Sequence, residues 1–204
     1  MEIKASQVKE LRDMSGVAMM ECKRALVDCE GDIQKALDLL RSNSALKAEK
    51  KASRVAADGI LRAFSGKNYS TLIEINSETD FASKDANFLG FANNVEEFIS
   101  QNKLLNISEI QESEIEEKRK SLVQTIGENI QLRRLETIEY DAEMNAGMYM
   151  HSDSKLASVV VVSGGDESLA KDIAMHVAAF NPLCLSQDDL DSEILEREKA
   201  IYMV

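Results

Sequence analysis

Histidine and cysteine are the residue types that most often carry covalent chemistry, and this chain has few of them. The histidines are His151 and His176, and the cysteines are Cys22, Cys29 and Cys184. A cysteine nucleophile would need a histidine beside it, yet no local pattern of an activated thiol surrounds any of the three, and buried structural cysteines are the commoner case. We therefore expect no catalytic residue and no enzyme.

A pair of glycines, Gly164 and Gly165, precedes a helical pattern and could present backbone N–H groups to an anion. The pair lacks the spacing of the known dinucleotide-binding and phosphate-binding motifs, and Asp166 would repel a phosphate. We interpret it as a tight turn. No carboxylate pair and no cluster of metal-ligand side chains stands out from the acidic background, so we expect neither a metal nor a cofactor.

The stretch Thr79-Asp80-Phe81 places a carboxylate beside a phenyl ring in a short polar connection between an alternating apolar segment and a helical pattern. Such a ring has two possible uses. It can fold back on its own helix, against Phe88 for example, as most aromatic side chains pack within their own domain. Alternatively, it can enter a partner's pocket while Asp80 acts on the charge beside it. These residues alone favour the first interpretation.

The chain of 204 residues carries 24 basic and 36 acidic side chains, which gives a net charge of −12. Long-range repulsion disfavours nucleic acid and anionic lipid as partners, so we expect protein partners. An odd number of cysteines without CxxC spacing favours reduced thiols in the cytoplasm. We expect no signal peptide and no membrane contact, since the longest apolar run, 157–162, is far too short to span a bilayer.

The hydrophobic spacing predicts an α+β protein with helices packed on a small antiparallel sheet. Lysine-rich residues in the region after the third helix indicate a linker or an exposed helix. Ser6 and Asp32 are the expected N-caps of the first and third helices. The expected divisions are a three-helix domain (1–43), a linker (44–57), an α+β core (58–186) and a C-terminal helix (187–204).

The core pattern alternates strands and helices, and we expect its strands to form one sheet. Turns are expected at 145–147 and 152–155, and a bulge at Arg133-Arg134, where the alternation slips. Leu169 is expected to face inward from the last core helix. The expected elements are a hairpin (59–76), strands (130–140, 148–151 and 156–162) and helices (85–101, 112–128 and 167–179).

Met19 and Met20 stand out in the three-helix domain. Adjacent residues on a helix point about 100° apart, so both cannot occupy the centre of a small core, and we expect one to be exposed. Methionine adapts well to binding surfaces, and Arg12 could lie at the rim of the same patch. The alternative, that both methionines are half-buried filler, stays open.

Several stretches fit one family pattern in order and at its spacing. They are 8–12 (VKELR) with Gly16, 19–23 (MMECK) with Ala25-Leu26, 56–59 (AADG), 78–81 (ETDF) with Lys84-Asp85, 127–130 (GENI) with Arg133-Arg134, and 173–179 (IAMHVAA). Together they cover most of the chain and resemble the elongation factor Ts family, the bacterial and organellar exchange factors for elongation factor Tu.

The resemblance implies a guanine nucleotide exchange factor of translation. Such a protein binds elongation factor Tu in its GDP-bound and nucleotide-free states and promotes GDP release so that GTP can bind. The resemblance implies that Thr79, Asp80, Phe81 and Ala82 enter the partner near its nucleotide magnesium and disturb the metal and phosphate site. It further implies an N-terminal ubiquitin-associated-like domain, no cofactor and no direct nucleic-acid contact, and it allows a homodimer.

The same resemblance implies that Arg12, Met19 and Met20 hold the partner's nucleotide domain from another side. His151 matches the family's tip histidine, which would press on the partner near its phosphate-binding loop. Ser152 follows His151 where the family usually has glycine.

A second departure is Ala82, where the family usually has valine. Longer members continue into a coiled-coil hairpin and a second half of the core, so we expect a short-form or truncated member. The alternative function is a non-catalytic adaptor that grips a protein through the three-helix domain.

Overall fold

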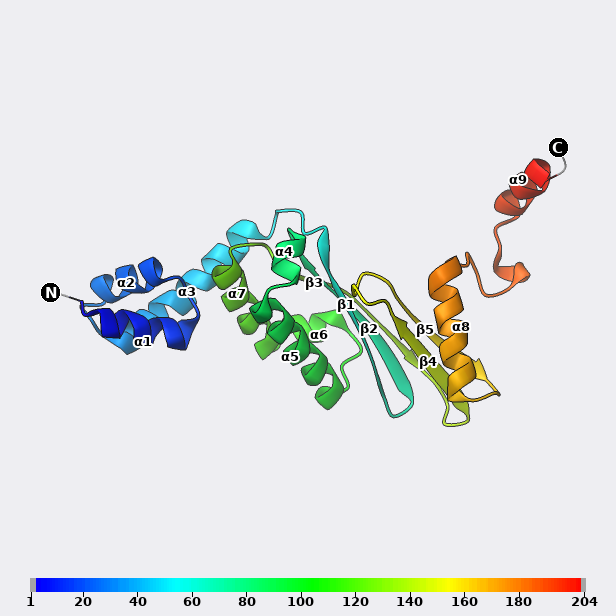
Figure 1. Ribbon diagram of the computed structural model, residues 1–204, viewed down its shortest axis with the longest axis horizontal. Coiled ribbons are helices and arrows are strands. Elements are labelled where there is room, and N and C mark those ends of the chain that lie inside the picture. Colours follow the sequence, from blue (N-terminus) through cyan, green and yellow to red (C-terminus); the bar gives the residue numbers. More distant parts are fainter. Residues whose placement is uncertain (1–2, 203–204) are drawn as a thin grey trace.

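Three N-terminal helices form a bundle around a small apolar core in the computed structural model, which describes residues 3–202 (Figure 1). The helices are α1 (Ala5–Ser15), α2 (Met19–Asp28) and α3 (Ile33–Lys51). Leu11, Cys22 and Leu26 are fully buried at the centre of the bundle. This core is separate from the larger one that follows.

Of the two predicted N-caps, Asp32 is confirmed and Ser6 is wrong. Asp32 caps α3, because its Oδ1 accepts a hydrogen bond of 3.0 Å from the amide of Lys35. Ser6 caps nothing, since α1 already begins at Ala5 with Lys4 as its N-cap residue. The amide of Lys4 donates to Oε1 of Gln7 at 3.1 Å, which fixes the earlier start.

Helix α3 continues without a break to Lys51, so most of the lysine-rich segment is helical and only 52–57 connects non-helically to the sheet. Ser44 and Ala48 are buried, and Ala48 belongs to the second core. The last turns of α3 pack against α7 (Glu114–Ile126). One rigid helix therefore joins the two cores, and the boundary between 43 and 44 stays a prediction.

The strands of the described residues form two antiparallel sheets, which corrects the expected single sheet. The first has the order β1-β2-β3, and the second pairs β4 with β5. Leu61 N donates to Ser154 O at 2.8 Å, which links the sheets without continuing the ladder. The strands are β1 (Asp58–Gly66), β2 (Tyr69–Ser77), β3 (Gln131–Glu139), β4 (Met144–Met150) and β5 (Ala157–Ser163).

Gly147 lies inside β4, so the turn expected at 145–147 is wrong. A Cβ atom at this position would lie 2.1 Å from the backbone of Ala170 on α8. The glycine serves close packing of a helix on the strand and not chain reversal.

The bulge expected at Arg133-Arg134 is confirmed. Glu74 pairs with Arg134 and Ile75 with Leu132, which leaves Arg133 as the extra residue of β3. Glu74 Oε1 accepts from Arg133 Nη1 at 2.7 Å, and its Oε2 lies 3.4 Å from Arg134.

Helices cover one face of the first sheet, and α8 packs on β4 and β5 (Figure 1). The expected helix 112–128 begins later, at a Ser113 cap, and a short helix before it was not predicted. Leu169 is 48% exposed, contrary to expectation, because Ala170 takes the inward position. The remaining helices are α4 (Asp80–Ser83), α5 (Ala86–Asn102), α6 (Ile107–Gln111), α8 (Glu167–Phe180), η1 (Gln187–Asp189) and α9 (Ser192–Tyr202).

The architecture is α+β, as predicted. Over residues 3–202, none of the helices is both long enough and apolar enough to cross a membrane. The same range holds no group of three histidine, cysteine, aspartate or glutamate side chains placed to bind a metal ion.

Gly59 should tolerate no side chain. Its φ is +141°, and a Cβ would lie 2.2 Å from Ile75 O, so we expect Gly59→Ala to lower the free energy of unfolding by about 2 to 4 kcal/mol in urea denaturation. Gly90 on α5 is the matched control because nothing lies within 4 Å of its Cβ position. Gly90→Ala should raise stability by about 0.5 to 1 kcal/mol. Equal effects of the two variants would contradict the strain assigned to Gly59.

Candidate functional site

Phe81 is exposed to water at the start of the four-residue helix α4 (Asp80–Ser83). Its side chain is 82% exposed, whereas Phe88 on the next helix is fully buried. The staple-like contact between these two rings is therefore wrong. Residues 80–83 form the one-turn helix α4 where the sequence predicted a loop.

Thr79 caps this turn and is itself fastened from outside. Thr79 Oγ1 accepts from the amide of Ala82 at 3.3 Å and donates to Glu128 Oε1 at 2.7 Å. The Thr79 amide donates to the other carboxylate oxygen of Glu128 at 2.9 Å. Ser77 Oγ adds a hydrogen bond of 2.9 Å to Thr79 O. Two charge-assisted bonds to one carboxylate fix the entrance to the turn.

The inner side of α4 is buried. Ala82 and Ser83 are almost inaccessible and pack toward β1 and β2. Because the inner positions are anchored, the turn must direct Phe81 outward. Ala82 itself is only 4% exposed in the free protein, so its role in partner binding stays a prediction.

Asp80 is half-buried, with 48% of its side chain exposed, and forms an ion pair within its own turn. Its Oδ2 accepts from Lys84 Nζ at 2.7 Å, and this hydrogen bond raises the pKa of Lys84. The two side chains are 48% and 72% exposed, and ion pairs in contact with solvent contribute little to stability. The carboxylate can therefore change partners at small cost.

Met19 and Met20 are both exposed, at 49% and 62%, whereas the sequence predicted one. They form the first turn of α2, and the small core below is already filled by Cys22, Ala25 and Leu26. Arg12 on α1 is exposed as well. Figure 1 places α1 and α2 at one end of the molecule and α4 over the sheet, so these residues do not join Phe81 in one cluster.

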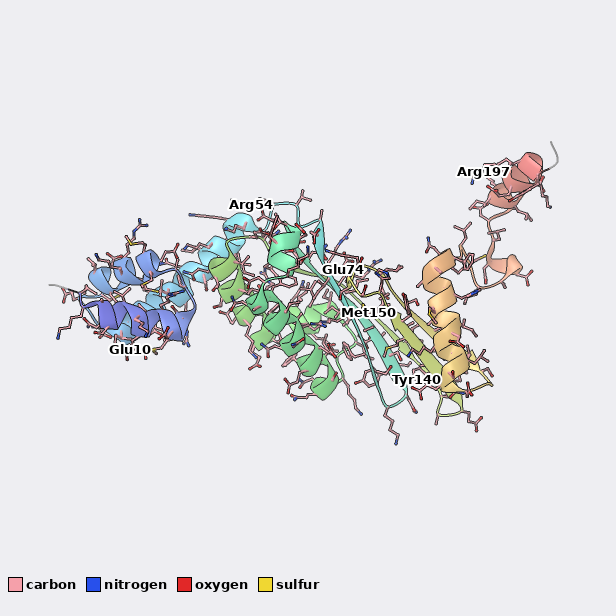
Figure 2. All side chains as sticks on the ribbon, viewed as in Figure 1. Glu10, Arg54, Glu74, Tyr140, Met150 and Arg197 are labelled. Carbon is pink, nitrogen blue, oxygen red and sulfur yellow. The ribbon has the colours of Figure 1, made fainter. Side chains whose placement is uncertain are left out.

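His151 lies in the turn between β4 and β5, directly after Met150, which Figure 2 labels at the end of β4. The histidine is exposed, and its Nδ1 lies 2.9 Å from Asp153 Oδ1. This contact lowers the pKa of Asp153. The His151 amide donates to Leu156 O at 2.9 Å, which closes the turn.

Glu78, directly before Thr79, and Asn129, directly after Glu128, form a second link between the same two segments. Glu78 Oε1 accepts from the Asn129 amide at 2.7 Å and lies 3.5 Å from Arg54 Nη1. Figure 2 shows Arg54 close to α4. Sequence reasoning gave no role to Glu128 or its neighbours, although they belong to the quoted stretch 127–130. Their position opposite Thr79 depends on contacts between residues about fifty apart, which no local pattern reveals.

The residues that could have carried catalysis have other contacts. His176 lies on the outside of α8, with its ring 5.0 Å from that of Phe180. Cys22 Sγ donates to Val17 O at 3.4 Å inside the bundle. Gly164 and Gly165 have φ values of +82° and +71°, as expected of a tight turn.

The fold is that of an α+β protein with a helical bundle beside two small antiparallel sheets and with exposed Phe81, Met19 and Met20. A family model described as Elongation factor TS matches residues 78–204. Three proteins named Elongation factor Ts are similar to this chain. Those from Hahella chejuensis, Marinobacter nauticus and Francisella tularensis subsp. novicida are 47%, 46% and 44% identical to it. Each alignment spans 98% of this chain, and 70%, 68% and 70% of the respective relatives. The chain belongs to the elongation factor Ts family, and it is a translation elongation factor of protein biosynthesis.

Removing the Glu128 carboxylate should loosen the turn that carries Phe81. We expect Glu128→Ala to lower the free energy of unfolding by about 1 to 3 kcal/mol, because two donors of Thr79 lose a charged acceptor. Hydrogen exchange measured by mass spectrometry should speed up at 79–83. The control is Glu97→Ala on α5, where the carboxylate accepts only an exposed bond from Gln101. Unchanged protection of 79–83 would contradict the anchoring role.

Proposed function

We propose that this chain is a guanine nucleotide exchange factor for elongation factor Tu. It binds the GDP-bound GTPase, disturbs the magnesium and phosphate site, and promotes GDP release so that GTP can bind. The observation that carries the proposal is Phe81, an exposed phenyl ring on a turn anchored by Thr79 and Glu128. Membership of the elongation factor Ts family supports it.

Exchange of this kind breaks no covalent bond. The factor binds the nucleotide-free partner more tightly than the nucleotide-bound one, and reciprocity requires that nucleotide then bind less tightly by the same factor. Burial of one phenyl ring contributes about 1.5 to 3 kcal/mol. If the ring is accepted only by the open state, nucleotide affinity falls by roughly tenfold to a hundredfold.

Asp80 supplies the electrostatic part of the proposed mechanism. Its carboxylate stands next to the ring and would meet the charges around the partner's nucleotide magnesium. In the free protein Lys84 occupies this carboxylate, and the exposed ion pair can be given up at little cost. Disturbing the metal coordination would add to the effect of Phe81.

The other exposed residues hold the partner in place. Arg12, Met19 and Met20 form a surface of one charged and two adaptable apolar side chains on the N-terminal bundle. We assign them to the grip on the partner's nucleotide domain. His151 would press near its phosphate-binding loop. The net charge of −12 fits a protein partner and not direct nucleic-acid binding, and we place this activity in the cytoplasm.

Phe81→Ala tests the wedge. We expect this variant to slow GDP release from elongation factor Tu roughly tenfold to a hundredfold, measured with a fluorescent GDP analogue, while the complex still forms. Phe180→Ala is the matched control, since this ring is 75% exposed at the end of α8. Exchange as fast as that of the unmodified chain would refute the role given to Phe81.

Arg12→Ala and Met20→Ala test the grip. Each should raise the concentration of factor needed for half-maximal exchange several-fold, with a smaller effect on the maximal rate, because an exposed contact to the partner is lost. Val27→Ala, an exposed residue in the last turn of α2, should change neither quantity. Intact affinity in both test variants would remove these residues from the interface.

The alternative function is an adaptor that binds a protein through the N-terminal bundle alone. The two exposed methionines on a bundle with its own core favour it. A deletion of 1–43 would cut α3 in the middle, so point variants separate the functions better. If the protein is an adaptor, Met20→Ala should abolish partner binding and Phe81→Ala should leave partner binding unchanged.

A further inference from the structure

Asp58, the first residue of β1, gathers hydrogen bonds from separate parts of the chain onto one carboxylate oxygen. Its Oδ1 accepts from the Gly59 amide at 2.7 Å, from Ser83 Oγ at 3.2 Å and from Lys155 Nζ. The donors Ser83 and Lys155 belong to the two turns that present Phe81 and His151.

On one side of this carboxylate lies α4. Ser83 is its last residue, almost fully buried, and its hydroxyl also lies 3.0 Å from Asp80 O. Asp58 therefore holds the end of the turn, as Glu128 holds its beginning. Phe81 lies between the two anchors.

On the other side lies the turn 151–155. Lys155 Nζ donates to Gly59 O as well as to Asp58, and Leu61 N donates to Ser154 O at 2.8 Å. Figure 1 shows the connection between β4 and β5 beside β1. These bonds fasten the tip of a separate two-stranded sheet onto the first sheet.

We propose that Asp58 and Lys155 are positioning residues that fix the His151 turn relative to the Phe81 turn, so that both meet the GTPase together. The inference rests on the proposed function. Two contacts held at a set spacing bind with a gain in effective concentration that two independently moving contacts lack. The Lys155 hydrogen bond keeps the pKa of Asp58 below its ordinary value, so the carboxylate is ionised at neutral pH.

The contribution of this pair to overall stability is small. Both side chains are partly in solvent, and exposed ion pairs contribute little to the free energy of unfolding. Variants of Lys155 should therefore fold normally, and a change in exchange activity would report the spacing of the turns.

The test is a double-mutant cycle on GDP release from elongation factor Tu with the full chain. Lys155→Met should lower the maximal rate about threefold to tenfold in the unmodified background and much less in the His151→Ala background. Lys155→Arg keeps the charge and the donors and should restore most of the rate. Lys67→Met, in the exposed turn between β1 and β2, is the control and should change nothing.

Hydrogen exchange in the free protein gives a readout that needs no partner. Lys155→Met should speed exchange in the peptides that contain Leu61 and 151–156 with an unchanged thermal midpoint, and Asp58→Asn should speed exchange in the same peptides. Unchanged protection would overturn the linkage. Equal effects of Lys155→Met with and without His151 would overturn the positioning role while leaving the exchange function standing. A chain that fails to accelerate GDP release at all would overturn the proposed function and this role with it.

Discussion

A phenyl ring kept in contact with water is the constraint on which the proposed function of this molecule depends. Burial of the Phe81 ring would be favourable by about 1.5 to 3 kcal/mol. The local structure must therefore keep the ring from packing against its own domain. The capped turn does so with polar contacts. Glu128 fixes Thr79 at the start, Asp58 fixes Ser83 at the end, and the side chain between them has no inward route.

The positions of the two anchors, Glu128 and Asp58, depend on unusual backbone geometry in the adjoining sheet. Gly59 allows β1 to pass so close to β2 that a Cβ would overlap Ile75 O, and this brings Asp58 beside α4. The bulge at Arg133 lies near the start of β3, shortly after Glu128, whose carboxylate accepts from Thr79. Two irregular backbone positions, Gly59 and Arg133, thus lie on strands that adjoin the anchors of this turn.

Much of the fold follows from local pattern, and the failures have a common cause. The α+β class, the Asp32 cap and the bulge rest on periodicity and capping chemistry that act over a few residues. Three features depend instead on contacts between elements that are distant in sequence. They are the division into two sheets, the inward side of α8 and the close approach of α8 to Gly147. Residues so far apart in sequence leave no periodic trace.

Some features of the candidate site could likewise be predicted from the sequence, and others could not. The residue types of Thr79-Asp80-Phe81 marked the stretch, but local statistics favoured packing of the ring against Phe88, which is wrong. Only the family resemblance pointed to an exposed ring. No local pattern distinguishes Glu128 or Asp58, because a lone carboxylate in an acidic chain carries no signal until its hydrogen-bond donors are in place.

Polar contacts also join the proposed grip to the proposed wedge. Glu21 on α2 accepts from Lys47 of α3 at 2.6 Å and from Gln124 of α7 at 3.3 Å, and the Lys47 hydrogen bond lowers its pKa. Further along α3, Lys51 donates to the carbonyl of Gly127, directly before Glu128.

A single helix thus orients the methionine surface on one side and contacts the anchor of the Phe81 turn on the other. Two contact surfaces on one rigid body bind a partner cooperatively only if their separation matches that partner. In the proposed function, the packed helix of the lysine-rich segment would set that separation. A flexible tether of the same composition would let the bundle bind without directing the ring.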